Sequence, residues 1–193
     1  PIPIINENVP IDATSEEVRL YREPVDDVVA YISGLLDESQ EYLPLQITDE
    51  SLEMGRITQP IAKAVKAQLL LLAASPLFNG NTDYANVKDN QGRALFPATY
   101  DENKWKLAAD AALDAIQTAE EAQHTIYYFK DAVTISDVTR KLLDIGEAVT
   151  EKWNKEIIWG STRDVTGLET QAMAKLSTGK NYNARSVLGP TLT

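Results

Sequence analysis

The side chains that could break a chemical bond in this sequence are mostly carboxylates, because the chain has one histidine and no cysteine. Many of them stand in adjacent acidic pairs, among them Asp26/Asp27, Asp101/Glu102 and Glu120/Glu121. Neighbours on a helix diverge by about 100°, so such a pair cannot face itself across a cleft as glycoside hydrolysis requires. The first two pairs also stand at expected helix starts, where the helix dipole favours anions. We therefore interpret the pairs as structural charges and expect no enzymatic activity.

Two other patterns resemble part of a catalytic site and part of a calcium-binding loop, but in each the remaining residues are missing. His124 follows an acidic helix end, which is the usual place of a surface histidine favoured by the helix dipole. The alternating polar residues 79–83 resemble the start of a calcium loop, but Tyr84 and Asn90 stand where that loop needs glycine and glutamate. We expect no catalytic residue, no metal site and no cofactor.

Aromatic residues near the C-terminal end could bind a sugar, because a ring face meets the C–H face of a pyranose while polar groups bond its hydroxyls. Trp159 precedes a loop that holds Arg163 and Asp164, and Tyr182 lies in a similar irregular segment. These are the candidate ligand-binding residues. The competing interpretation is that Trp159 closes the core, which is also the place that we predict for Trp105.

Helical periodicity and the prolines predict the elements that hold these residues. We expect four helices, at about 24–43, 59–75, 101–121 and 136–152. A loop is expected at 76–100 and a short strand at 156–159. Single apolar stripes mark three helices: Val25, Val28, Val29, Ile32, Leu35 and Leu36; Trp105, Ala108, Ala109, Ala112, Ile116 and Ala119; Val138, Leu142, Ile145 and Val149. The helix at 59–75 is apolar almost all round and should be buried between neighbours.

These elements predict a mainly α fold of antiparallel helical hairpins that is similar to a tetratricopeptide stack, although no strict 34-residue period is present. We expect an extended lead-in over 1–22, a helical scaffold over 23–159 and an irregular segment over 160–193. The hydrophobic fraction of 44% is ordinary for a globular protein. A net charge of −11 repels phosphate backbones, so we exclude nucleic acid as a partner. No apolar run reaches the ~18 residues of a membrane span.

Four groups of segments follow one another along the chain in an order and spacing that chance would not produce. They are residues 1–4; 23–28 with 42–44; 55–58 with 64–67 and 73–80; and 95–97 with Tyr100, Asp101, Trp105, Ala108, Ala109 and 156–159. The most specific is Ala73-Ala74-Ser75-Pro76-Leu77-Phe78-Asn79-Gly80. Together they resemble the SusD/RagB family of outer-membrane nutrient-binding lipoproteins. Gln59-Pro60 departs from the Lys-Gly-like pair that is usual there. The chain opens at Pro1 without a lipidated cysteine, so we expect it to be an internal, mature portion of a longer protein.

The resemblance implies a tetratricopeptide-like scaffold that binds oligosaccharide or polysaccharide without cleaving it. It further implies a SusC-like TonB-dependent transporter as partner, and a surface-exposed place on a Gram-negative outer membrane. Contact with the membrane itself would be only through an N-terminal lipid anchor that this chain lacks. Two alternatives remain open: a helical-repeat adaptor for other proteins, and a glycoside hydrolase fragment.

Overall fold

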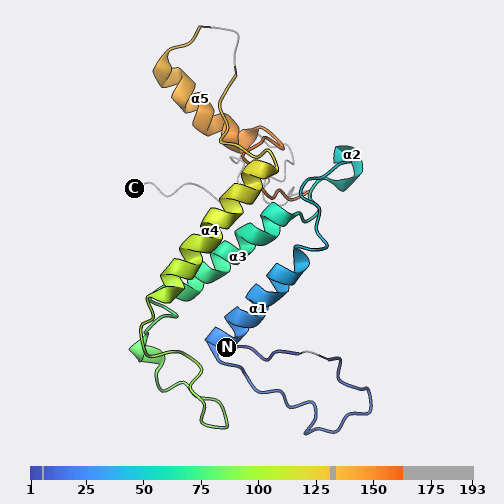
Figure 1. Cartoon of the computed structure of the whole chain (residues 1–193), viewed down its shortest axis with the longest axis vertical. Helices are drawn as coiled ribbons and strands as arrows, with labels where there is room; N and C mark the ends of the chain where they lie inside the picture. The colour runs from blue at the N-terminus through green and yellow to red at the C-terminus, as the bar shows by residue number, and fades with distance from the viewer. Residues whose placement is uncertain (6, 131–133, 163–193) are drawn as a thin grey trace, which may run out of the picture. The chain divides into compact units, whose positions relative to one another are not determined.

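The computed structural model describes residues 1–5, 7–130 and 134–162, and these are mainly helical (Figure 1). The elements in chain order are α1 (Val25–Ser39), α2 (Glu50–Glu53), α3 (Gln59–Ala74), the 3₁₀ turn η1 (Thr82–Tyr84), α4 (Asn103–Glu121) and α5 (Asp137–Thr150). The expected helical class is therefore confirmed. Contacts divide the chain into two units, Pro1–Gly160 and Ser161–Thr193, and all of these elements belong to the first. None of the described helices is long and apolar enough to cross a membrane.

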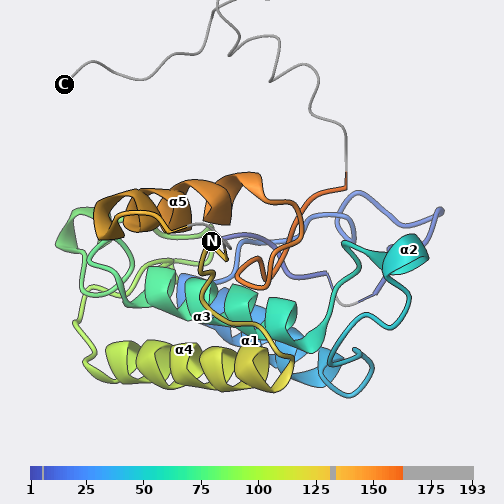
Figure 2. The ribbon, with the colours of Figure 1, turned by 90° about the horizontal axis from the view of Figure 1, so that it is seen from above.

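Helix α3 is the centre of the packed body, because it packs against both α1 and α4, whereas the backbones of α1 and α4 stay apart and an ion pair between Asp26 and Lys104 links them (Figures 1 and 2). The buried side chains at these contacts are small or branched: Val25, Val28, Ile61, Ala62, Ala73, Ala74, Ala108, Ala115 and Ala119. Alanines at a helix contact let the two backbones approach closely. The core is therefore a narrow seam on each side of α3.

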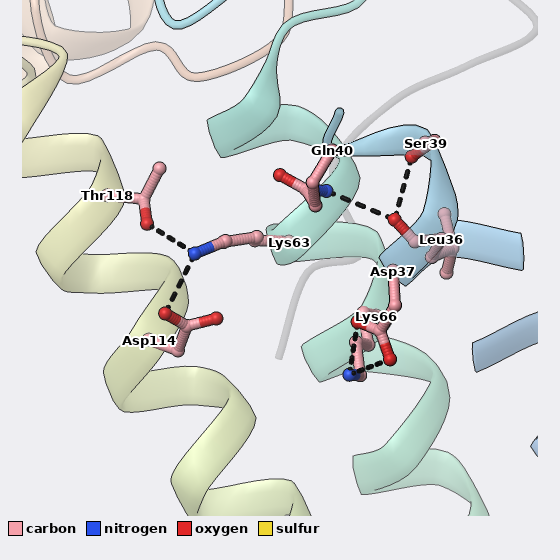
Figure 3. A network of polar contacts seen from close by, with 8 residues as sticks. All are labelled: Leu36, Asp37, Ser39, Gln40, Lys63, Lys66, Asp114 and Thr118. Atoms are coloured by element: carbon pink, nitrogen blue, oxygen red, sulfur yellow. Dashed lines mark hydrogen bonds and ion pairs between the residues drawn. The ribbon is translucent and has the colours of Figure 1, made fainter. Parts of the chain in front are cut away.

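Polar contacts fix the antiparallel directions of these helices. At the start of α3, the Gln59 side-chain amide donates to the carbonyls of Gln40 and Leu43, which follow the end of α1. Also early in α3, Lys63 Nζ lies 2.8 Å from Asp114 Oδ1 and 2.9 Å from Thr118 Oγ1, both late in α4 (Figure 3). Each neighbour thus runs opposite to α3. The unusual Gln59 of the sequence has a structural role, since it satisfies carbonyls that the end of α1 leaves unpaired.

At the other end of the pair, the loop between α3 and α4 is folded back on the helices. Asn79, which is 3% exposed, bridges to the backbone of Asp101 through both ends of its side-chain amide. Leu95 is 2% exposed, and its carbonyl accepts the backbone N–H of Val25 at the start of α1. Phe96 stacks on Phe78, and its ring is tilted against that of Tyr84. This long loop is therefore a structural part of the packed body.

Several predicted faces are wrong, and the reason is which neighbours are present. Trp105 was expected in the core but is 39% exposed, because α4 packs only on α3 and buries its line of small residues there. The stripe of α5 is exposed along its whole length, because among the described elements α5 packs on no other helix. Leu71 and Leu72 are half-exposed, although the sequence predicted a helix buried all round. Residues 156–159 form turns and bends, so the expected strand is also wrong.

Candidate functional site

The end of α4 is built so that His124 turns back toward a distant segment. The N–H of His124 donates to the Ala119 carbonyl at 2.8 Å, and that of Gln123 donates to Glu120 at 2.9 Å. This pair of bonds is the Schellman ending of a helix, which needs a left-handed residue and usually takes glycine. Here Gln123 adopts it with a φ of 63°. A non-glycine residue in this conformation costs roughly 1 kcal/mol.

The segment after α5 contains a second left-handed residue, Trp153, with a φ of 56°. The next residue, Asn154, is buried and holds the turn: its Nδ2 donates to the carbonyls of Ala148 and Glu151, and its Oδ1 accepts the N–H of Glu156. A bulky residue in the left-handed region is strained, and strained residues of this kind cluster at functional sites. The buried amide network keeps Trp153 in this place.

Two segments about thirty residues apart meet here. The Lys155 carbonyl accepts the backbone N–H of Thr125 at 3.1 Å and lies 3.1 Å from His124 Nδ1. A carbonyl only accepts hydrogen bonds, so the proton of a neutral His124 ring lies on Nδ1 and leaves Nε2 as an acceptor. The ring of Trp153 also presses on Gly160, where an added Cβ would lie 2.7 Å from ring atom Cζ3. The junction is therefore tightly fitted.

A cavity of about 230 Å³ opens at this junction, and we call it the tryptophan cavity. Its aromatic walls are Trp153 and Trp159, which are 38% and 58% exposed. Its polar lining includes side chains from three segments of the chain: Gln46, Glu50, Arg56, His124 and Asn154. Apolar rings beside amide, carboxylate and guanidinium groups are the combination that binds a sugar. Glu50 is the one carboxylate in the described lining, whereas glycoside hydrolysis uses two.

A second cavity of about 490 Å³ adjoins the first, because both are lined by Trp153, Asn154 and Lys155. We call it the tyrosine cavity, since Tyr127 and Tyr128 lie in its lining. A hydrogen bond to the Glu151 carboxylate raises the pKa of Tyr127 to about 12, with smaller effects from partial desolvation and from the negative charges of nearby carboxylates. The Tyr127 hydroxyl therefore stays protonated through the physiological range.

The candidate residues named from sequence have different outcomes. Trp159 lies in the lining of the tryptophan cavity, at a partly exposed position. Arg163, Asp164 and Tyr182 lie outside the described residues. Arg56 and His124 line the cavity but were not candidates, because nothing in their local sequence signals a meeting with Trp159.

Comparison with known proteins gives structural neighbours only. The chain resembles part of BT4246, a Bacteroides thetaiotaomicron protein, with 34% identity and a TM-score of 0.72 over 85% of this chain. The selenomethionine form of BT4246 gives 31% identity and a TM-score of 0.65 over the same share. The chain spans 31% of the length of these neighbours. No protein-family profile and no curated protein matches the sequence.

Proposed function

We propose that this chain is part of a SusD/RagB-type protein that binds glycans at the outer surface of a Gram-negative cell. The observation that carries the proposal is the tryptophan cavity, where Trp153 and Trp159 stand beside Glu50, Arg56 and His124. The resemblance of its ordered segments to that family supports the assignment. So does the fold that the chain shares with part of a Bacteroides thetaiotaomicron protein.

The cavity suits binding without cleavage. A half-exposed indole offers a flat apolar surface for the C–H face of a pyranose, and its two-angle side chain loses little entropy when a ligand binds. Arg56 can donate to sugar hydroxyls, while Glu50 and Nε2 of a neutral His124 can accept from them. The strained turn at Trp153 places one ring before any ligand arrives, which lowers the cost of ordering it. The proposed role is therefore capture of an oligosaccharide or polysaccharide, with no bond broken.

The proposed partner is a SusC-like TonB-dependent transporter, which would receive the captured glycan. The proposed place is the outer membrane, through a lipid anchor carried by a part of the protein outside this chain. Cross-linking in outer membranes of the native cell, followed by purification of the complete protein, tests both. Recovery of a TonB-dependent barrel is the expected result. Recovery of the protein in the soluble fraction with no barrel would count against this partner and this location.

A glycan microarray followed by calorimetry on the best ligand tests the binding role. Trp159→Ala should weaken binding at least tenfold, which is about 1.4 kcal/mol. Trp105→Ala is the matched control, because Trp105 is another partly exposed tryptophan and lines neither cavity. If no glycan binds, the function is wrong. If Trp159→Ala binds as well as the wild type, the site is wrong. Release of new reducing ends would favour the hydrolase alternative.

A further inference from the structure

A groove lies between α1 and α4, on the side of α3 that these two helices leave uncovered. We call it the α1/α4 groove, and its volume is about 750 Å³. The apolar part of its lining comes from all three helices: Val29, Ala30, Leu70, Ala73, Leu107 and Ala111. Leu107 is 55% exposed in the described structure. The groove exists because α1 and α4 each pack on α3 while their own backbones stay apart, linked by the Asp26–Lys104 ion pair.

The walls are spaced to receive another helix. The lining residues of α1 are 26, 29, 30, 33, 34 and 37, and those of α4 are 104, 107, 110, 111 and 114. Steps of three and four keep each set on one face of its helix. Each face is about 17 Å long at 1.5 Å per residue, which corresponds to about three helical turns. A third helix of similar length can pack along these two faces.

The α1 wall is also made of small residues. Ala30, Ser33 and Gly34 follow one another along it, and a Cβ added at Gly34 would meet no atom within 4 Å. Open space at a helical glycine on a groove wall allows the close approach of a bulky apolar side chain from outside. This feature favours a packed helix over a loosely held extended peptide.

The charges that line the groove determine which sign of charge a partner must carry. Five carboxylates line it: Asp26, Asp37, Asp101, Asp110 and Asp114. Its two lysines are already paired with the α1 wall. Lys66 Nζ lies 2.6 Å from Asp37 Oδ1 (Figure 3), and Lys104 Nζ lies 2.6 Å from Asp26 Oδ1.

Asp101 and Asp110 have no ion-pair partner in the described part of the chain. The groove is therefore an apolar floor with an excess of negative charge along its walls, which attracts cationic side chains.

We propose that the α1/α4 groove docks one amphipathic helix of a partner protein, with an apolar stripe flanked by lysine or arginine. The stripe fills the space above Leu70, Ala73 and Leu107, and the flanking cations meet Asp101 and Asp110. This site is separate from the tryptophan cavity, with which its lining shares no residue. The inference does not depend on glycan binding.

The test uses the complete chain and two fluorescent 18-residue peptides, followed by anisotropy. One peptide has leucine at the a and d positions of a heptad and lysine or arginine at e and g, and the other has the same composition scrambled. We expect one-to-one binding of the first, at least tenfold weaker binding of the second, and several-fold weakening in high salt, which screens exposed charges. Asp110→Asn should weaken the patterned peptide about threefold and reduce its salt dependence.

Gly34→Leu is the blocking variant, because leucine favours the helix and its side chain enters the groove. It should weaken the patterned peptide at least tenfold. Gly146→Leu is the matched control, since Gly146 is also a helical glycine with open space around its Cβ position and lies in α5, outside the groove. Equal binding by the two variants, equal binding of the two peptides, or no binding at all would overturn the proposal. So would a wild-type dimer that Gly34→Leu converts to monomer, because a second copy would then occupy the groove.

Discussion

Replacing Asn79 by alanine should separate the ends of α3 and α4. The Asn79 side chain donates from Nδ2 to the Asp101 carbonyl at 2.9 Å and accepts the Asp101 N–H at Oδ1 at 2.8 Å. A third contact, from Nδ2 to the Ala74 carbonyl, is near the limit of a hydrogen bond at 3.4 Å. The substitution removes the two good bonds and leaves two backbone groups of Asp101 without their partner.

The magnitude follows from those two bonds. An ordinary hydrogen bond contributes about 1 kcal/mol net, and a buried group left unpaired costs about 1–3 kcal/mol. Asp101 is itself exposed, so water can reach part of its backbone and the cost stays near the lower end. We expect Asn79→Ala to lower the free energy of unfolding by about 2–3 kcal/mol. With a urea m-value of about 2 kcal/mol/M, the midpoint should fall by roughly 1–1.5 M.

The assay is urea unfolding followed by circular dichroism, with Asn81→Ala as the control. Asn81 lies in the same loop, and its contacts to Leu77 and Asp83 are in exposed positions. Its replacement should cost less than about 1 kcal/mol. If the two variants lose equal stability, or if Asn79→Ala costs less than about 1 kcal/mol at an unchanged m-value, the bridge to Asp101 does not hold the helices as described.

Three further substitutions test the geometry of the site. Gly160→Ala should displace the Trp153 ring, because the new Cβ would lie 2.7 Å from it. We expect a shift in tryptophan emission with little change in circular dichroism, and an unchanged emission spectrum would refute the contact. Gln123→Gly should stabilise the protein by about 1 kcal/mol in thermal unfolding, since glycine adopts the left-handed ending of α4 without strain, and a loss of stability would refute the strain. Glu151→Gln should lower the pKa of Tyr127 from about 12 toward its ordinary value in an absorbance titration. In the wild type, the hydrogen bond to Glu151 should stabilise the fold below the ordinary tyrosine pKa, and this contribution should vanish as pH rises through 12.

The helices could be predicted from sequence because their limits are local. Pro24 precedes the first residue of α1, Pro60 lies in the first turn of α3, and Ser136 caps α5. The helix that ends at Ala74 cannot continue through Pro76. The buried faces could not, because burial depends on which other helices are present. Trp105 belongs to the apolar stripe of α4, but the residues of α4 that are buried against α3 are alanines, and Trp105 stays partly exposed. Gln59 also looked like a departure from a family pattern, and its purpose appears only with the carbonyls of α1 in place.

The candidate site divides in the same way. Trp159 was a candidate from sequence, because its indole precedes a loop that holds Arg163 and Asp164, and it lies in the lining of the tryptophan cavity. The cavity itself could not be predicted from sequence, because the lining comes from residues near 50, 124 and 155, which tertiary folding brings together. The left-handed backbone of Trp153 leaves no mark in the sequence, since the amide of Asn154 imposes it through bonds to α5 and Glu156.

The tryptophan cavity and the α1/α4 groove lie at different places on the α3–α4 pair, and this predicts how each responds to a destabilising substitution. The lining of the tryptophan cavity includes Thr58 and Ala122, at the start of α3 and the end of α4, whereas Asn79 and Asp101 lie at the opposite end. The groove lining includes Asp101 itself. Loosening that end with Asn79→Ala should therefore weaken the patterned peptide in the α1/α4 groove while ligand binding at the tryptophan cavity is retained. If both fall together in protein that is still folded, the pair moves as one rigid unit and the two sites are coupled through α3.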